Sequence, residues 1–466
     1  QALGWVLYDF LKQQIEKASM QGVERVMKKI VEISRPSFED FFFERVVKSC
    51  SYFLYTQRQE KSIMVFPKDL AVLMLKLPYK RPSLVHSKCL ETMLNYKQEA
   101  LLFLGFARYW GPMNFLPVDF EKRQNKAGRF YCSLAESYVG SLSKAYYSAR
   151  ISQPEANEQT IFFCADEIIE IIEFAETKIR GNIFFNYYKA LLLFLEGRVE
   201  EARRAFSLLL AQKPNDSWAW GKLAGLYTEK PEQMLPLLCK ALICPGPGEM
   251  KVKLHEKLGL QLYQTNNFGN AKRELNRVIA IRNNNNWPLP DKILQILDDK
   301  NMLEANIVSD SRKFYLEHAA QAFRIAFKST PYNNGIITDV AKKENKTIVT
   351  YMISREEIGR FRLQDWMPVA EPGQTGRIYF KQETGGRVIY WEPLEIKLPP
   401  AITRTVTGKL KIFTGKNFGF INNVFVPPTL YKQIETNTTI EVKVLAVSAY
   451  DKTQRKWGWR AIKIIK

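Results

Sequence analysis

The segment GKNFGFINNVFVPP, residues 415–428, combines aromatic and basic side chains at spacings that suit nucleic-acid binding. Side chains alternate between the two faces of a strand, so the runs NFGFI and NVFVP each separate aromatic from aliphatic residues. A small barrel buries its aliphatic side chains, which predicts Ile421, Val424 and Val426 inside and Phe418, Phe420 and Phe425 outside, beside Lys416. Outward-facing rings can stack on bases of any sequence while cations contact phosphates. The alternative is that these rings form an interface with another part of the chain.

Five strand-like segments can position these residues within 401–466. They are TGKLKIF, NFGFI, NVFVP, TTIEVKVLAVSAY and WGWRAIKII. The Asn-Asn pair before NVFVP and the segment DKTQRK before WGWRAIKII are typical of turns. Five short segments rich in Val, Ile and Phe predict a small closed barrel.

These runs resemble the cold-shock domain family. In that family a Lys-Trp-Phe strand precedes a Lys-Gly-Phe-Gly-Phe-Ile strand and a Val-Phe-Val-His strand. The matching runs here are Lys411-Ile412-Phe413, Lys416-Asn417-Phe418-Gly419-Phe420-Ile421 and Val424-Phe425-Val426-Pro427. The resemblance implies that Phe413, Phe418, Phe420 and Phe425 stack on bases beside Lys411 and Lys416. Ile412 and Pro427 replace the family's stacking Trp and His, which implies weaker binding or a different ligand.

The last predicted strand carries Trp457 and Trp459 on one face, with Lys456 and Arg460 adjacent. These tryptophans would partly replace the missing stacking residues. The alternative is that they cover the end of the barrel or pack on the preceding domain. With Lys409, the expected nucleic-acid-binding set is Lys409, Lys411, Phe413, Lys416, Phe418, Phe420, Phe425, Lys456, Trp457, Trp459 and Arg460.

The charge distribution favours a polyanionic partner. The 466 residues carry a net charge of +20. Residues 401–466 contain 12 Lys+Arg and 3 Asp+Glu, and residues 1–150 contain 23 and 14, so each segment has a net charge of +9. The 250 residues between them contribute only +2. Such an excess at both ends favours nucleic acid, an anionic membrane or an acidic protein as a partner.

The middle of the chain contains a repeat of 34 and 35 residues, with units that start near residues 183, 217 and 252. Small side chains that allow helices to approach alternate with large ones that fill the space between them. The small residues are Ala190, Ala202, Ala224, Gly259 and Ala271, and the large ones are Phe206, Trp220 and Tyr227. The pattern resembles the tetratricopeptide repeat, although Pro236 stands where a small residue is expected. The resemblance implies a groove for a partner protein.

We therefore expect a helical solenoid followed by two small barrels similar to oligonucleotide-binding (OB) and cold-shock domains. The expected domains are an irregular helical domain (1–180), tetratricopeptide-like repeats (181–305), a linker helix with a first OB-like barrel (306–400) and a cold-shock-like barrel (401–466). The linker helix is SRKFYLEHAAQAFRIAF, and the first barrel contains GIITDVA, KTIVTYMI, GRIYFK and GRVIYWEPLEI.

No catalytic constellation is visible in the sequence. The six cysteines are scattered without a C-x-x-C pair, and the three histidines, at 86, 255 and 318, are far apart. The phosphate-binding Gly-Lys-Ser/Thr motif and the H-E-x-x-H and G-x-S-x-G motifs are absent. We expect no enzyme activity, no cofactor, no metal site and no membrane partner, and cytoplasmic localisation.

The sequence thus predicts a non-enzymatic adaptor. Its barrels would bind single-stranded RNA or DNA, and its helical repeats would dock a partner protein. The order of tetratricopeptide-like helices and cold-shock-like barrels resembles accessory proteins of bacterial conflict (anti-phage) systems. The alternatives are a protein–protein scaffold that binds no nucleic acid and a factor associated with the ribosome or with transcription.

Overall fold

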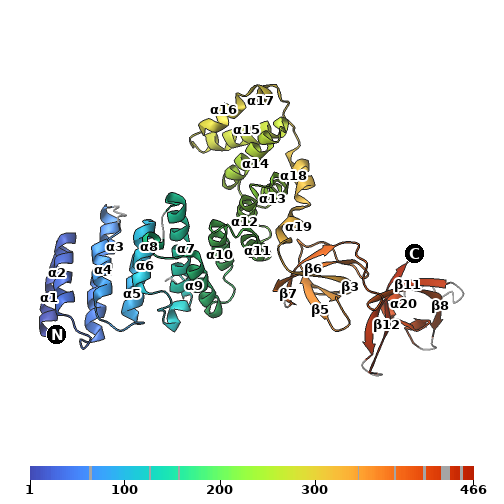
Figure 1. Cartoon of the computed structure of the whole chain (residues 1–466), viewed down its shortest axis with the longest axis horizontal. Helices are drawn as coiled ribbons and strands as arrows, with labels where there is room; N and C mark the ends of the chain where they lie inside the picture. Colours follow the sequence, from blue (N-terminus) through green and yellow to red (C-terminus); the bar gives the residue numbers. More distant parts are fainter. Residues whose placement is uncertain are drawn as a thin grey trace. The chain divides into compact units, whose positions relative to one another are not determined.

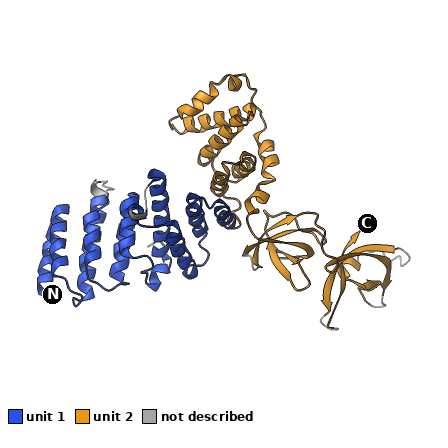
Figure 2. Ribbon diagram, viewed as in Figure 1, with its two compact units in different colours: residues 1–209 blue, residues 210–466 orange. Residues whose placement is uncertain are grey.

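The computed structural model describes residues 1–61, 66–124, 127–155, 158–344, 346–382, 385–412, 416–431, 441–451 and 455–465. The chain divides into two compact units, residues 1–209 and residues 210–466 (Figure 2). Helices form unit 1 and the first part of unit 2, and strands form the rest of unit 2 (Figure 1). The predicted order of helical and β-rich regions is therefore confirmed. The division between the units falls inside the first predicted repeat.

Unit 1 is a succession of helices interrupted by one small hairpin. Its elements are α1 (Ala2–Glu16), α2 (Met20–Ile33), α3 (Asp40–Lys61), α4 (Lys68–Lys76), α5 (Leu84–Met93), η1 (Leu94–Tyr96), α6 (Ala100–Trp110), η2 (Pro117–Phe120), β1 (Arg123–Gln124), β2 (Phe130–Tyr131), α7 (Leu134–Ser152), α8 (Glu158–Ile161), α9 (Ala165–Lys178), α10 (Phe184–Leu195) and α11 (Val199–Leu210), the last of which ends one residue into unit 2. The β1–β2 hairpin was not predicted. It follows η2 in a segment that is rich in basic and aromatic residues. This segment lacks the alternation of apolar and polar residues that predicts a strand.

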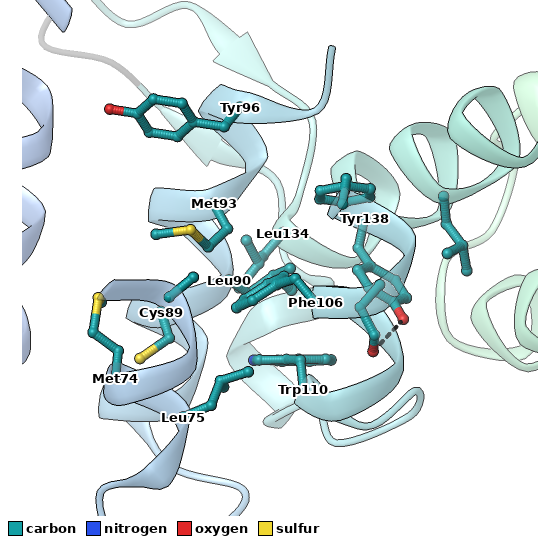
Figure 3. Close-up of a cluster of buried hydrophobic side chains, with 14 of the residues drawn as sticks. Met74, Leu75, Cys89, Leu90, Met93, Tyr96, Phe106, Trp110, Leu134 and Tyr138 are labelled. Carbon is teal, nitrogen blue, oxygen red and sulfur yellow. Dashed lines mark hydrogen bonds between the residues drawn. The ribbon is translucent and has the colours of Figure 1, made fainter. Parts of the chain in front are cut away.

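The core of unit 1 contains large aromatic side chains between neighbouring helices, including Trp110 and Tyr138 (Figure 3). The Trp110 ring lies parallel to the His86 ring, with centroids 4.6 Å apart. Each residue also hydrogen-bonds the other's backbone, since Trp110 Nε1 donates to the His86 carbonyl at 2.9 Å and His86 Nε2 lies 2.8 Å from the Trp110 carbonyl. Burial and the nearby charge of Arg81 lower the pKa of His86 to about 4, so this histidine has a structural role.

Three helical hairpins follow the predicted repeat. They are α10/α11, α12 (Ser217–Ala224)/α13 (Pro231–Ile243) and α14 (Val252–Gln264)/α15 (Phe268–Asn284), which begin at residues 184, 217 and 252. The predicted packing residues Ala202, Phe206, Trp220 and Ala271 are all buried. A β-carbon at Gly259 would lie 2.6 Å from Leu275 Cδ2, which explains the glycine in α14. The helical array therefore has the predicted tetratricopeptide-like pattern.

The remaining helical elements of unit 2 are η3 (Gly225–Tyr227), η4 (Gly248–Lys251), α16 (Asp291–Leu297), α17 (Lys300–Glu304), α18 (Ser311–Ala319) and α19 (Ala322–Phe327). The prediction of one linker helix was wrong, because α18 and α19 are separate helices. Tyr315 anchors α18 by a hydrogen bond to Glu274 of α15. Phe323 and Phe327 anchor α19 against the first sheet, where they contact Tyr390.

The first sheet contains β3 (Tyr332–Lys343), β4 (Lys346–Met352), β5 (Ile358–Leu363), β6 (Thr375–Gln382) and β7 (Gly385–Pro393). Its antiparallel order is β5-β4-β3-β6-β7, and strand β5 was not predicted. In the part of the chain that the structure describes, no ladder joins β5 to β7, so the predicted closed first barrel is an open sheet. Aromatic rings connect the two edge strands, β5 and β7, at this open edge. Trp366, three residues after β5, contacts Tyr390 of β7, and both rings contact Phe323 of α19.

The C-terminal barrel is closed, as predicted. It contains β8 (Thr403–Ile412), β9 (Gly419–Ile421), β10 (Val424–Val426), α20 (Pro428–Tyr431), β11 (Glu441–Asp451) and β12 (Lys456–Ile465). Its cyclic order is β8-β9-β10-β12-β11, and the only parallel pair among its described strands is β10–β12. The four antiparallel pairs of the first sheet occur in the same order as those of the barrel. The open sheet therefore has the strand order of the barrel without its closing parallel pair.

Candidate nucleic-acid interface

The two short strands β9 and β10 sort their side chains as the alternation predicted. Ile421, Val424 and Val426 are completely buried in the barrel core, whereas Phe420 and Phe425 on the opposite face are half-buried. Gly419 faces the interior, where a β-carbon would lie 2.6 Å from the carbonyl oxygen of Lys411. A side chain at this position would therefore separate β8 from β9.

Phe418, Phe420 and Phe425 form one cluster on the outer surface, which we call the phenylalanine face. The ring centroid of Phe425 lies 5.5 Å from that of Phe418 and 5.7 Å from that of Phe420. The rings of Phe418 and Phe420 are 6.3 Å apart and nearly perpendicular. These contacts hold three aromatic surfaces together on two adjoining strands.

The strand register places a cation at each end of a row through this cluster. Lys411 of β8 is opposite Phe420 of β9, Phe420 is opposite Phe425 of β10, and Phe425 is opposite Arg460 of β12. Neighbouring strands are about 4.8 Å apart, so the row extends for about 14 Å. Lys411 and Arg460 are exposed. Across these four strands, the row therefore consists of a cation, two rings and a second cation.

Two of the other predicted cations adjoin this row in sequence, and the third, Lys456, lies farther along β12. Lys409 is two residues from Lys411 on the same face of β8, opposite Glu441 of β11, and Lys416 precedes the first phenylalanine. Lys456 shares the face of β12 that carries Arg460, at the far end of the strand opposite Asp451. All three lysines are exposed. Phe413, the remaining predicted stacking residue on this side, lies outside the described residues.

Sequence reasoning missed one further cation, Lys443 of β11. It is exposed and lies opposite Thr407, two residues before Lys409 on β8. The alternating pattern EVKV could have identified this outward-facing lysine, but only with knowledge of the β8–β11 register.

The two tryptophans do not join the phenylalanine face. Trp459 is opposite the buried Val424 and packs against the barrel core, and the Arg404 guanidinium lies 4.1 Å from the centre of its ring. Trp457 lies on the same face of β12, opposite Tyr450, with their rings 5.4 Å apart. Arg460 and Lys456 point to the other face. The tryptophans therefore lie on a different face of β12 from Arg460, and Trp457, which is 38% exposed, has the Arg355 guanidinium 5.8 Å from its ring centre.

The contact between the barrel and the first sheet uses another side of the barrel. Ile402, Val447 and Ile462 of the barrel form an apolar cluster with Ile336 and Met352 of the first sheet. The phenylalanine face is not part of this cluster.

Within the described ranges, no group of three or more His, Cys, Asp or Glu side chains could hold a metal ion. Over the same residues, no helix is both long and apolar enough to cross a membrane.

Comparisons with known proteins identify two regions. Residues 404–464 match the family model of "S1/CSD-like domain 2 of the TOTE conflict systems", which covers almost the whole barrel. Residues 183–322, from α10 to the start of α19, match a domain of unknown function, DUF7017. No curated protein matches the chain.

Among solved structures, a tetratricopeptide repeat protein from Parabacteroides merdae ATCC 43184 is similar, with 12% identity and a TM-score of 0.29. The similarity covers 65% of this chain and 100% of that chain. The chain thus combines a helical array that resembles tetratricopeptide repeats with a C-terminal barrel similar to the S1/CSD-like domains of TOTE conflict systems.

Proposed function

We propose that the barrel binds single-stranded nucleic acid on its phenylalanine face. Bases stack on Phe418, Phe420 and Phe425, while exposed cations around them contact the phosphates. The observation that carries this proposal is the row Lys411–Phe420–Phe425–Arg460, because two adjacent rings can stack on bases while the cation at each end contacts a flanking phosphate. The similarity to S1/CSD-like domains supports the same interpretation.

The whole chain would act as a non-enzymatic adaptor in the cytoplasm. Its tetratricopeptide-like repeats would dock a partner protein, and the barrel would bring that partner to RNA or DNA. The description of the matching barrel family, which names TOTE conflict systems, supports a role in a conflict system. We propose that this system is bacterial and acts against phage. The match to that family covers only the barrel and so does not indicate which partner the helical repeats bind. We therefore propose only that the partner is a protein.

We further propose that the first sheet is an OB-like fold opened at one edge. Its strand order, which equals that of the closed barrel without the parallel pair, supports this relationship. The rings of Trp366, Tyr390 and Phe323 occupy the open edge and would take over the packing that a closing ladder provides.

Removing two of the three rings tests the proposed function. We expect Phe420→Ala/Phe425→Ala to weaken binding of a fluorescent single-stranded oligonucleotide of about 16 nucleotides in the full chain. Base stacking contributes about 1–3 kcal/mol per ring, so each substitution should raise Kd by roughly 5- to 150-fold. Fluorescence anisotropy gives the Kd, and thermal melting shows whether the barrel remains folded.

Tyr450→Ala is the matched control, because Tyr450 is an exposed aromatic residue of the same barrel that lies away from the phenylalanine face. It should leave Kd within about two-fold of the original value. Equal Kd values for the folded double variant and the control would contradict stacking on these rings. If the original chain bound no oligonucleotide at low salt, the scaffold alternative would be favoured.

A further inference from the structure

Unit 1 contains a groove that the proposed function of the barrel does not use. Two adjoining cavities, of about 700 and 320 Å³, lie between α3, α5 and the β1–β2 hairpin. Both are lined by Lys48, Lys88, Glu91 and Arg123, so these residues connect them. We call the two cavities together the α3 groove.

The larger cavity is strongly basic. Among its described lining residues are five cations, Lys48, Arg58, Lys88, Lys97 and Arg123, and one carboxylate, Glu91. Charge along unit 1 has the same bias, because residues 51–150 contain 15 Lys+Arg and 7 Asp+Glu, whereas residues 151–209 contain 6 and 10. The larger cavity therefore lies in the most positive part of unit 1, which suits an anionic ligand, whereas the smaller cavity is also lined by Glu44 and Asp119.

Glu91 positions two of these cations, and Glu44, which lines the smaller cavity, forms an ion pair with Lys48. Lys88 Nζ lies 2.8 Å from Glu91 Oε2, and Arg123 Nη1 lies 2.6 Å from Glu91 Oε1. Burial alone would raise the pKa of Glu91, but the hydrogen bonds and charges of Lys88 and Arg123 outweigh burial and lower it. Glu91 is therefore ionised at neutral pH and holds both cations at the point where the two cavities meet.

Aromatic rings and cations share one face of α3 beside this groove. On α3, Phe41, Arg45, Lys48, Tyr52 and Tyr55 recur at spacings of three and four residues and so share one face of the helix. Tyr52 and Tyr55 are 64% and 59% exposed although both line the larger cavity. Across the cavity, Tyr131 of the hairpin is 47% exposed, and the Arg123 guanidinium lies 5.1 Å from its ring centre.

We propose that the α3 groove is a second binding site for single-stranded nucleic acid, independent of the barrel. The tyrosines Tyr52, Tyr55 and Tyr131 provide stacking surfaces for bases, and Lys48, Lys88 and Arg123 contact phosphates. The carboxylates of an acidic peptide would satisfy the same cations but offer no aromatic ring to stack on the three exposed tyrosines. The combination of charge and rings therefore favours nucleic acid over an acidic peptide.

Substitutions in the full chain separate this site from the barrel. In the Phe420→Ala/Phe425→Ala background, the remaining affinity for a fluorescent single-stranded oligonucleotide should fall at least five-fold when Tyr52→Ala/Tyr55→Ala is added. Tyr109→Ala is the matched control, since Tyr109 is 69% exposed on α6 and lines neither cavity. Crosslinking of a 4-thiouridine oligonucleotide, followed by mass spectrometry, should label peptides that contain Tyr52, Tyr55 or Tyr131.

The outcomes distinguish failure of either site. If only the tyrosine substitutions weaken binding, the barrel proposal fails and the α3 groove stands. If the tyrosine substitutions change Kd no more than Tyr109→Ala in both backgrounds, and crosslinks are absent from these peptides, the groove proposal is overturned. Loss of binding to a poly-glutamate probe without any change for the oligonucleotide would also overturn it, in favour of an acidic peptide.

Discussion

Interior and exterior positions of the barrel were predictable from single residues wherever a strand alternates cleanly. Ile421, Val424 and Val426 occupy the core, and the phenylalanine next to each of them along the strand faces outward, as alternation requires. The tryptophans of β12 were not predictable in this way. Trp459 faces inward because it is opposite Val424, and this parallel register leaves no trace in the local sequence.

Gly419 allows a residue-scale prediction about the same barrel. We expect Gly419→Ala to destabilise it by about 1–3 kcal/mol, because a β-carbon would collide with the Lys411 carbonyl and with Leu410 Cδ1, 2.8 Å away. Hydrogen exchange of the β8 and β9 amides in the full chain should then accelerate by roughly 5- to 150-fold. Gly248→Ala is the control, since a β-carbon added at Gly248 would have no atom within 4 Å. Unchanged exchange in both variants would refute the steric argument.

At the scale of elements, the sequence indicated the helical hairpins, most strands and the closure of the C-terminal barrel, but not the open edge of the first sheet. The repeat period identified α10 to α15 because Ala and Gly positions recur at helix contacts. Strand β5 was missed because IGRFRL has only Phe361 buried between exposed arginines. The open edge of the first sheet depends on Phe323, Trp366 and Tyr390, which lie in three separate segments and show no common pattern in the sequence.

A buried carboxylate joins three of these elements and gives a pH-dependent prediction. Glu274 of α15 is completely buried, 2.7 Å from His255 Nδ1 of α14, and it accepts hydrogen bonds from Tyr315 of α18 and from Arg273. Burial would raise its pKa, but the hydrogen bonds from His255 and Tyr315, with the charge of His255 and the hydrogen bond from Arg273, lower it below the ordinary 4.5. The ionised group therefore stabilises the fold above pH 4.5, and this contribution is lost as the pH falls through the lowered pKa.

We expect Glu274→Gln to lower the melting temperature of the helical part of unit 2 at neutral pH. The difference from the original chain should shrink as the pH falls below 4.5, since the original Glu274 becomes protonated as well. Calorimetric scans from pH 7 to pH 3 measure this difference, with Glu304→Gln on the exposed end of α17 as the control. A constant difference over that range would mean that ionisation of Glu274 does not stabilise the α15–α18 contact.

At the scale of the whole molecule, charge and aromatic surface coincide in both units. The two segments of net charge +9 contain the α3 groove and the phenylalanine face, respectively. The sequence revealed the charge of both segments but the rings of only one. The phenylalanine face can be recognised in the sequence because its three rings lie within eight residues. The α3 groove cannot, because its residues come from α3, α5 and the β1–β2 hairpin.

The salt dependence of oligonucleotide binding by the full chain tests the central claim most directly. The logarithm of the association constant should fall with the logarithm of salt concentration by about 0.7 per phosphate contact. Lys411→Ala/Arg460→Ala should reduce this slope by about 1.4, because both ends of the row lose a contact. Lys300→Ala, on the exposed face of α17, should leave it unchanged. Binding that falls steeply with salt, with this loss of slope, is the predicted result; absence of binding at low salt, or an unchanged slope in the double variant, would contradict it.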